Sequence, residues 1–196
     1  MLRTKSLICK LNSINISSKS IFIRLMNKYS PKSEICPVCQ SKGSFSVHSY
    51  YNRSVIDFTS GQRIKDNICI MRVKCTHCHH THAILPDIII PYASYSIHFI
   101  LQVLLLYFSH IHTIEKICEY FSISQNQLFK WISLFQKHKQ EWLGLFIDNK
   151  ISCYNFCTTL MDQDIFSNFL ESFTQKFQIS FLQKHRNPYP HRYLNS

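Results

Sequence analysis

Hydrophobic and polar positions follow two different periods along the chain, and the change lies near residue 92. Before it, β-prone apolar runs cover residues 45–51, 54–58 and 68–73. Such runs predict strands, because successive side chains of a strand point to opposite faces of a sheet. The stretch Thr59-Ser60-Gly61-Gln62 lies between the last two runs and predicts a turn.

After residue 92 the apolar positions recur at helical spacing. We expect a first helix from Ser94 or Ser96 to Phe108, a second that begins after the N-cap Thr113, and a third that begins after Ser124. The third helix carries an apolar stripe at i, i+3, i+4 and i+7, made of Leu128, Trp131, Ile132 and Phe135. The fold class that follows is α+β, with a small β unit ahead of an all-α module.

The same pattern divides the chain into four segments. Residues 1–33 form a basic N-terminal arm, which we expect to be disordered, and residues 34–92 form the β unit. Residues 93–144 form the helical module. Residues 145–196 form a helical C-terminal extension, in which Asp164 is expected to cap a helix and Asn187-Pro188-Tyr189-Pro190 to belong to a loose tail.

Two CxxC pairs adjoin the predicted strands. A CxxC turn brings two thiolates to one ion, and zinc favours four such soft ligands in a tetrahedron. The chain has nine cysteines, an odd number that suits a metal site in a reducing compartment better than a disulfide framework. We therefore expect the β unit to be a zinc ribbon, with Zn²⁺ held by Cys36, Cys39, Cys75 and Cys78.

Two alternatives for the cysteines stay open. One of the neighbouring histidines could replace a cysteine as ligand; these are His77, His79, His80 and His82. Unrelated buried thiols or a redox CxxC are the other alternative, although no βαβ pattern surrounds either pair. A site closed by four thiolates leaves no position for a reacting water, so the expected role of the zinc is structural.

Residues 113–137 have the length and spacing of a helix-turn-helix, in which the second helix would enter the major groove of DNA. The expected DNA contacts all lie on that helix or at its start: Ser124, Gln125, Asn126, Gln127, Lys130 and Lys137. Asn and Gln can pair with adenine, and Lys reaches guanine or phosphate. A helical hairpin inside a bundle has similar spacing, so a purely structural role is the alternative.

The formal charge of the chain is +11, from 22 Lys and Arg against 11 Asp and Glu. Such a charge favours a polyanionic partner, and duplex DNA is the expected one. Residues 1–35 carry seven basic and one acidic side chain, which is more than half of the excess. The charge therefore lies mainly on the N-terminal arm and does not by itself place a DNA site in the helical module.

Several motifs together carry a family resemblance. They are Cys36-Pro37-x-Cys39, Arg53, the basic strand that leads from Ile70 into Cys75-x-x-Cys78, and Thr81-His82-x-x-Leu85-Pro86. With the downstream helices, they make residues 34–144 resemble an uncharacterised bacterial domain family with a transposase-like zinc ribbon ahead of a helix-turn-helix. The resemblance implies recognition of mobile-element DNA.

The chain departs from the usual pattern at one point of each CxxC turn. A glycine often follows the second cysteine of such a turn, because this position can require a positive φ. Gln40 and His79 stand there in this chain.

No catalytic activity is expected. A transposase needs an acidic triad that holds two metal ions, whereas the six Asp and five Glu of this chain are scattered and only about 50 residues follow the helical module. We expect a zinc-dependent DNA-binding protein of transposase-like or regulatory type. The alternatives are a protein-interaction module, with a transposase or another protein as partner, and the N-terminal part of a split transposase.

The most apolar stretch covers residues 97–108 and is shorter than the roughly 20 residues that a membrane span needs. The N-terminus has no continuous apolar segment of the kind found in a secretory signal. We therefore expect a cytoplasmic protein without a membrane partner; an organelle presequence, which has a similar composition, is the alternative for the N-terminus. The pattern leaves its oligomeric state open.

Overall fold

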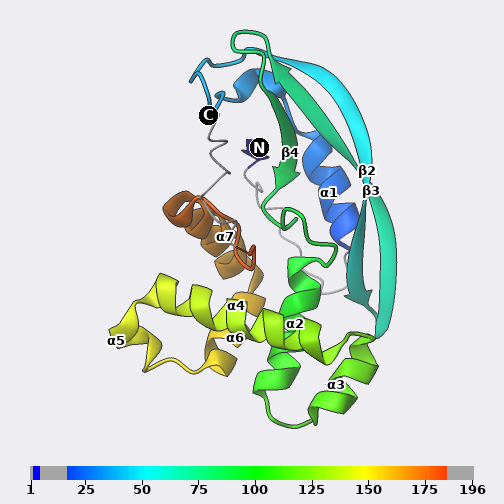
Figure 1. Cartoon of the computed structure of the whole chain (residues 1–196), viewed down its shortest axis with the longest axis vertical. Coiled ribbons are helices and arrows are strands. Elements are labelled where there is room, and N and C mark those ends of the chain that lie inside the picture. The colour runs from blue at the N-terminus through cyan, green and yellow to red at the C-terminus, as the bar shows by residue number, and fades with distance from the viewer. Residues whose placement is uncertain (1, 5–16, 185–196) are drawn as a thin grey trace, which may run out of the picture.

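The computed structural model describes residues 2–4 and 17–184, which form a mixed α+β fold (Figure 1). The strands form one sheet in the order β1-β4-β3-β2; they are β1 (Leu2–Thr4), β2 (Phe45–Thr59), β3 (Gln62–Cys75) and β4 (Thr81–Pro86). β2, β3 and β4 are antiparallel neighbours, and β1 pairs in parallel with β4.

Helices cover much of the rest of the described chain. They are α1 (Ser18–Asn27), α2 (Ile97–Phe108), α3 (Ile114–Phe121), α4 (Gln125–Leu143), α5 (Leu145–Asp148), α6 (Cys153–Met161) and α7 (Gln163–Phe177), with one 3-10 turn, η1 (Pro31–Ser33). Helices α2 to α7 gather at one end of the molecule, and α1 lies along the sheet (Figure 1).

The strands β2 and β3 form one long, curved hairpin (Figure 1). The two predicted runs at 45–51 and 54–58 belong to a single strand of 15 residues. The predicted turn is confirmed at Ser60 and Gly61, where φ is 53° and 76°. Two successive positive φ values are typical of the tight turns that join antiparallel strands. The tip of this hairpin lies at the helical end of the molecule.

The segment expected to be a disordered arm contains helix α1, so that expectation is wrong for this helix. Ile21 and Phe22 are buried in the main core. The Asp57 carboxylate accepts hydrogen bonds from the Ser18 backbone N–H at 2.7 Å and from the Ser18 hydroxyl at 2.8 Å. An apolar face and an anion at the N-terminus both stabilise a helix. Residues 5–16 of the predicted arm lie outside the described residues.

The three predicted central helices are confirmed. α2 begins after Ser96, α3 after Thr113 and α4 after Ser124, and each cap hydroxyl accepts a hydrogen bond from the backbone N–H three residues further on. α4 continues to Leu143, beyond the predicted end of the helical pair near Lys137. Among the helices that the structure describes, none combines the length and the apolarity needed to cross a bilayer.

Helices α6 and α7 pack into the same core as α2 and α4. Phe156 of α6 and Phe173 of α7 are buried. Beyond α7, the backbone N–H of Leu182 donates to Nδ1 of His138 in α4 at 3.0 Å. The C-terminal helices therefore complete the helical core, and the predicted tail around residues 187–190 lies outside the part of the chain that the structure describes.

The N-cap of α7 is Asp162, and the prediction of Asp164 is wrong. The Asp162 carboxylate accepts hydrogen bonds from the backbone N–H groups of Asp164 and Ile165. A cap residue has an extended backbone just ahead of the first turn, and Asp162 has this conformation, whereas Asp164 already lies in the turn.

One hydrophobic core joins the sheet to the helices. Its members from both parts of the chain include Ile68, Ile70, Leu85, Phe99 and Phe135. The change of pattern near Tyr92 therefore separates strands from helices along the chain and does not separate two cores. Among the residues whose burial the structure describes, a second buried cluster contains Val73 and Ile84, with partly buried neighbours around it, toward the cysteine end of the hairpin.

Candidate metal centre

Two loops carry the cysteine pairs, and both have the same backbone hydrogen bonds. The first loop links η1 to β2, and the second links β3 to β4. In each loop, the residue four positions after the first cysteine donates its backbone N–H to the carbonyl of that cysteine. The first cysteine donates its own backbone N–H to the carbonyl of the residue five positions after it. The bonds are Gln40 to Cys36 at 2.8 Å, Cys36 to Ser41 at 2.9 Å, His79 to Cys75 at 3.0 Å and Cys75 to His80 at 2.9 Å. The loops are thus two copies of one turn.

The position after the second cysteine is left-handed in both loops although neither has a glycine there. φ is 61° at Gln40 and 62° at His79. This conformation costs a residue with a side chain about 1–2 kcal/mol, and the hydrogen bonds of the turn offset it. Glutamine and histidine therefore adopt, at this position, the left-handed conformation that usually calls for glycine.

A glycine is required a little further along the first loop. Gly43 has a φ of 68°, and a Cβ atom added there would lie 2.9 Å from the backbone oxygen of Lys32. The Gly43 N–H also donates to the carbonyl of Glu34 at 2.9 Å. This close approach holds the end of the first loop against η1, so the loop that carries the two cysteines is closed at its base.

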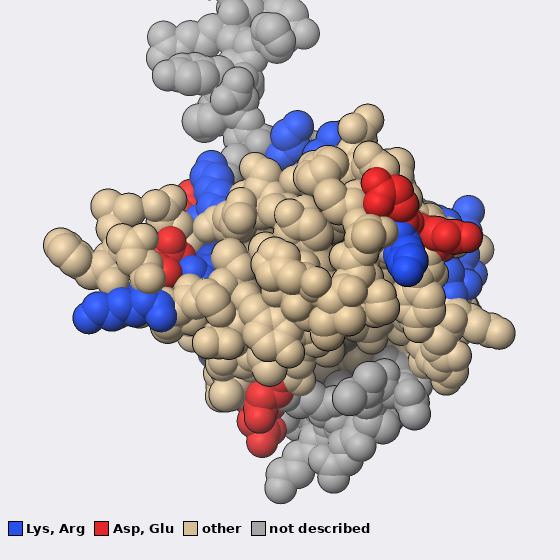
Figure 2. Space-filling model, turned by 90° about the horizontal axis from the view of Figure 1, so that it is seen from below, with Lys and Arg blue, Asp and Glu red and all other residues tan. Residues whose placement is uncertain are grey.

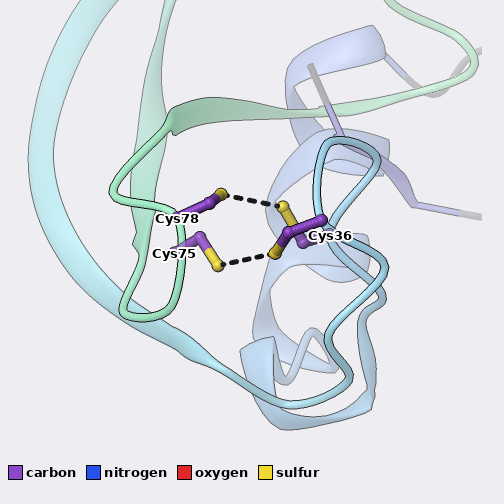
Figure 3. A group of neighbouring side chains, drawn as sticks. Cys36, Cys75 and Cys78 are labelled. Atoms are coloured by element: carbon purple, nitrogen blue, oxygen red, sulfur yellow. Dashed lines mark hydrogen bonds between the residues drawn. The ribbon is translucent and has the colours of Figure 1, made fainter.

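The two loops bring the four predicted cysteines together. The Sγ atoms of Cys36 and Cys78 lie 3.6 Å apart, and those of Cys39 and Cys75 lie 3.7 Å apart. All four sulfurs lie within 4.8 Å of one another, and all four thiols are free. Figure 3 shows Cys75 and Cys78 pointing across to the loop of Cys36. A disulfide has sulfurs about 2.05 Å apart, so these four thiols are not paired in disulfides and could together hold a metal ion.

Hydrogen bonds at the cluster favour thiolates. The Ser41 hydroxyl lies 3.0 Å from Cys39 Sγ and 3.5 Å from Cys75 Sγ. This hydroxyl, with the Ser41 backbone N–H, lowers the pKa of Cys39 to about 5, and it is also the main cause of the lowered pKa of Cys75. Sequence reasoning missed Ser41. The signal that could have found it is its place two residues after a CxxC pair, where the chain closes the turn.

The pKa of Cys78 moves in the opposite direction, to about 12. A hydrogen bond from the backbone N–H of His80 lowers this pKa. Burial and the three neighbouring thiols together raise it by more than that hydrogen bond lowers it. Four thiolates this close repel one another unless a cation lies among them. A metal ion held by the four sulfurs would supply that charge.

One of the four neighbouring histidines differs from the others. His77, His79 and His80 are exposed, whereas His82 is buried in β4 with Nε2 3.6 Å from Cys36 Sγ. Its ring packs edge-on against Phe45. Burial lowers the pKa of His82, so its ring is neutral at neutral pH. His82 therefore contacts a cysteine of the cluster, and the sequence alone had grouped it with three surface histidines.

The six residues predicted to contact DNA lie on or just before α4, at the other end of the hairpin from the cysteines (Figure 1). Gln125, Asn126 and Lys130 are exposed, and Gln127 is half-buried. Ser124 is exposed, but its hydroxyl caps the helix. Lys137 is exposed and pairs with Glu141 at 3.8 Å. A strand of 14 residues spans about 45 Å along its course, so β3 keeps the cysteine cluster apart from α4.

The hairpin tip contacts the turn between α3 and α4. Arg63 of β3 donates from Nη1 to the backbone oxygen of Ser122 at 2.9 Å, and its guanidinium lies 5.8 Å from the centre of the Tyr95 ring. Ser122 has a left-handed φ of 51° and ends α3. Sequence reasoning did not single out Arg63, because its partner lies 59 residues further along the chain.

Comparisons with known proteins give a family match for one part of this chain. Among curated proteins and among solved structures, nothing matches the chain significantly. A family model described as "Domain of unknown function (DUF6431)" matches residues 36–117, which contain both cysteine loops, β2 to β4, α2 and the first half of α3. α4 lies outside the match. A domain of unknown function, DUF6431, therefore covers residues 36–117 of this protein.

Proposed function

We propose that the protein holds one structural zinc ion at the cysteine cluster and binds duplex DNA through α3 and α4, without a catalytic activity of its own. The observation that supports DNA binding is the position of α4 next to the hairpin tip. The exposed first turn of α4 lies beside the hairpin tip, where Arg63 braces the turn between the two helices.

The sulfur geometry supports zinc. With Zn–S bonds of about 2.3 Å, the sulfurs of a tetrahedral site lie about 3.8 Å apart, close to the 3.6 and 3.7 Å of the two facing pairs. Four thiolates in a tetrahedron select zinc or iron. Elemental analysis of the purified chain is expected to give one zinc per chain, and stoichiometric iron in its place would contradict the assignment.

The arrangement of α3 and α4 supports DNA as the partner. Two helices joined by a turn of three residues match the helix-turn-helix, whose second helix presents its N-terminal residues to base edges. Gln125 and Asn126 occupy that place and carry the amides that pair with adenine. Lys130 follows one turn later on the exposed surface of α4.

The hairpin tip supports contacts to phosphate. Arg63 and Lys65 are exposed on β3, close to the turn that precedes α4. Contacts to phosphate position a DNA-binding protein, whereas contacts to bases give it specificity. In this proposal the first turn of α4 reads bases, while Lys130 and the two basic residues of the tip contact the DNA backbone and fix the register.

The test is binding of the full chain to duplex DNA over a series of salt concentrations. The full chain is required, because α1, α6 and α7 complete the core. Each lost phosphate contact reduces the salt slope by about 1, so Lys65→Ala and Lys130→Ala should each lower it by that amount. Lys150→Ala, an exposed lysine after α5, is the matched control and should leave the slope unchanged.

The base-reading part is tested with a duplex selected from a random pool. Gln125→Ala should weaken binding to the selected site by about 1–3 kcal/mol and leave non-specific binding unchanged. A chain with Lys5 and Lys10 changed to alanine removes two of the positive charges of the predicted arm and so tests its contribution. Loss of all DNA binding in that chain, with no effect of Lys65→Ala or Lys130→Ala, would contradict the proposal.

A protein partner is the second candidate, and one observation favours it. Residues 93–184 contain seven Lys and Arg and seven Asp and Glu, so this region has no net charge. Figure 2 shows the molecule from its helical end, where few side chains are charged and the basic ones lie toward the edges. Absence of DNA binding by the full chain would favour this candidate.

A further inference from the structure

The side chain of His82 reaches the cysteine cluster from β4. Its Nε2 lies 3.6 Å from Cys36 Sγ, a distance at which nitrogen and sulfur share a hydrogen bond. His82 pairs with Val73 across the β3–β4 ladder, and both residues are buried, whereas the preceding Thr81 is exposed. Successive side chains of a strand point to opposite faces. The alternation of β4 therefore directs this histidine inward, toward the sulfurs.

The contact between His82 and Cys36 is shielded from solvent. Cys36 is 0% exposed and His82 is 4% exposed. The ring of Phe45 packs against the imidazole, with the ring centres 5.8 Å apart and the planes at 89°, and so holds its orientation. A buried anionic sulfur is costly unless hydrogen-bond donors surround it. Since bulk solvent does not reach Cys36, such a donor must come from the protein.

The other three sulfurs have donors within the two cysteine loops. The Ser41 hydroxyl lies beside Cys39 and Cys75. The backbone N–H two residues after Cys78 donates to the sulfur of Cys78. Cys36 has its side-chain neighbour from outside the loops, in β4. The hydrogen bonds to the cluster are therefore divided between the loops and the sheet.

The nitrogen–sulfur contact determines where the ring proton lies when a metal is bound. A hydrogen bond between the two atoms needs a hydrogen on one of them. A cysteine that binds a metal has lost its proton, so Cys36 then has no S–H to donate. The hydrogen must therefore be on Nε2 of His82. Such a bond to an ionised acceptor is stronger than one between neutral groups.

We propose that His82 is a positioning residue of the metal site: it donates its Nε2–H to the Cys36 thiolate and does not itself bind the ion. The four sulfurs complete a tetrahedral set without it. A donor of this kind orients the ligand and offsets part of the negative charge of four thiolates. The inference rests on the proposed zinc site and is independent of the proposed DNA binding.

The test is the zinc affinity of the full chain, measured by competition with a chromophoric chelator. The amide of a glutamine reaches the place of Nε2, whereas the shorter asparagine reaches only the place of Nδ1. His82→Asn should therefore weaken zinc binding about 10–100-fold, and His82→Gln should keep most of the wild-type affinity. His77→Asn, at an exposed histidine of the second loop, is the matched control and should leave the affinity unchanged.

Nitrogen–proton NMR of the His82 ring gives a second readout, which uses the wild-type chain and does not depend on a variant that folds. In the zinc-loaded chain Nε2 should carry a proton. In the cadmium-loaded chain the metal should couple to that proton through the Cys36 sulfur. A role in packing alone would produce neither signal.

Four results in a zinc-loaded chain overturn this inference alone. They are an unprotonated Nε2, a direct cadmium–nitrogen coupling at His82, wild-type affinity in His82→Asn, and equal losses in the asparagine and glutamine variants. A wild-type chain that binds no zinc overturns this inference together with the proposed zinc site.

Discussion

The two parts of this molecule are stabilised in different ways. Residues 17–92 contain ten Lys and Arg and four Asp and Glu, and the cysteine end of this part has only Val73 and Ile84 in its own buried cluster. Residues 93–184 have no net charge and contain most of the aromatic core. A small sheet end with little to bury depends on cross-links, whereas a helical bundle of this size is stabilised by its own apolar contacts.

Aromatic packing illustrates the difference. The ring of Phe135 lies 5.5 Å from Phe108, 5.8 Å from Phe156 and 5.9 Å from Phe181, measured between ring centres. At the cysteine end, four sulfurs and the hydrogen bonds of two turns take the place of such a core. A change to the cysteine cluster and a change to the aromatic core should therefore have separable effects.

The two parts meet at the hairpin tip. Phe58 of β2 lies 4.7 Å from Phe121 and 6.1 Å from Phe99, between ring centres. Arg63 adds its hydrogen bond to Ser122. This junction couples the two parts at the hairpin tip, while the cysteine end extends beyond helices α2 to α7 (Figure 1).

The largest effect is expected from loss of a cysteine ligand. Cys36→Ser or Cys75→Ser should abolish stoichiometric metal binding and unfold the cysteine end, because metal binding supplies about 10–16 kcal/mol to a small domain of this kind. Metal content and hydrogen exchange of the β3 and β4 amides measure this. Cys69→Ser, an exposed cysteine outside the cluster, is the control. Retained metal in both ligand variants would contradict the four-cysteine site.

Truncation of the aromatic core tests the other part. Phe135→Ala should lower the free energy of unfolding by about 3–5 kcal/mol, because it leaves a cavity among packed rings, while the folded chain keeps its metal. Denaturant unfolding and metal analysis measure the two effects. Phe129→Ala, on the same helix but 47% exposed, should have a much smaller effect. Loss of metal from folded Phe135→Ala would show that the two parts are not separable.

Removal of the carboxylate that anchors α1 should have an intermediate effect. Asp57→Ala leaves the Ser18 N–H and hydroxyl without their acceptor, which should cost about 1–3 kcal/mol of stability. Faster hydrogen exchange in α1 measures it. Asp66→Ala breaks the more exposed pair with Lys19 and should cost at most about 1 kcal/mol. Equal effects of both changes would show that Asp57 has no special role in holding α1.

The smallest effect is expected from the hydroxyl beside the sulfurs. In Ser41→Ala the pKa of Cys39 should rise from about 5 toward the usual thiol value. The metal must then displace a proton at neutral pH, so its affinity should fall about tenfold, and fall further as the pH decreases. Competition with a chromophoric chelator measures this. Ser44→Ala, whose hydroxyl bonds to the Lys42 carbonyl, is the control. Equal affinity in both variants would contradict the role of Ser41.

Much of the candidate metal site could be predicted from the sequence, because CxxC spacing is a local signal. The four cysteines are the ones named from their spacing, and the structure places them together. Which sulfur faces which could not be predicted, since Cys36 lies opposite Cys78 only after the hairpin has formed. The burial of His82 likewise depends on its place in β4, and no local pattern separates it from His80.

Features that depend on neighbouring residues follow from the amino-acid sequence alone: the caps at Ser96, Thr113 and Ser124 and the turn at Ser60 and Gly61. The tertiary structure decided what packs where. Helix α1 is held by Asp57, 39 residues away, and the C-terminal helices close the core of α4. Periodicity identifies the apolar face of an element, whereas the partner of that face is set by contacts between distant segments.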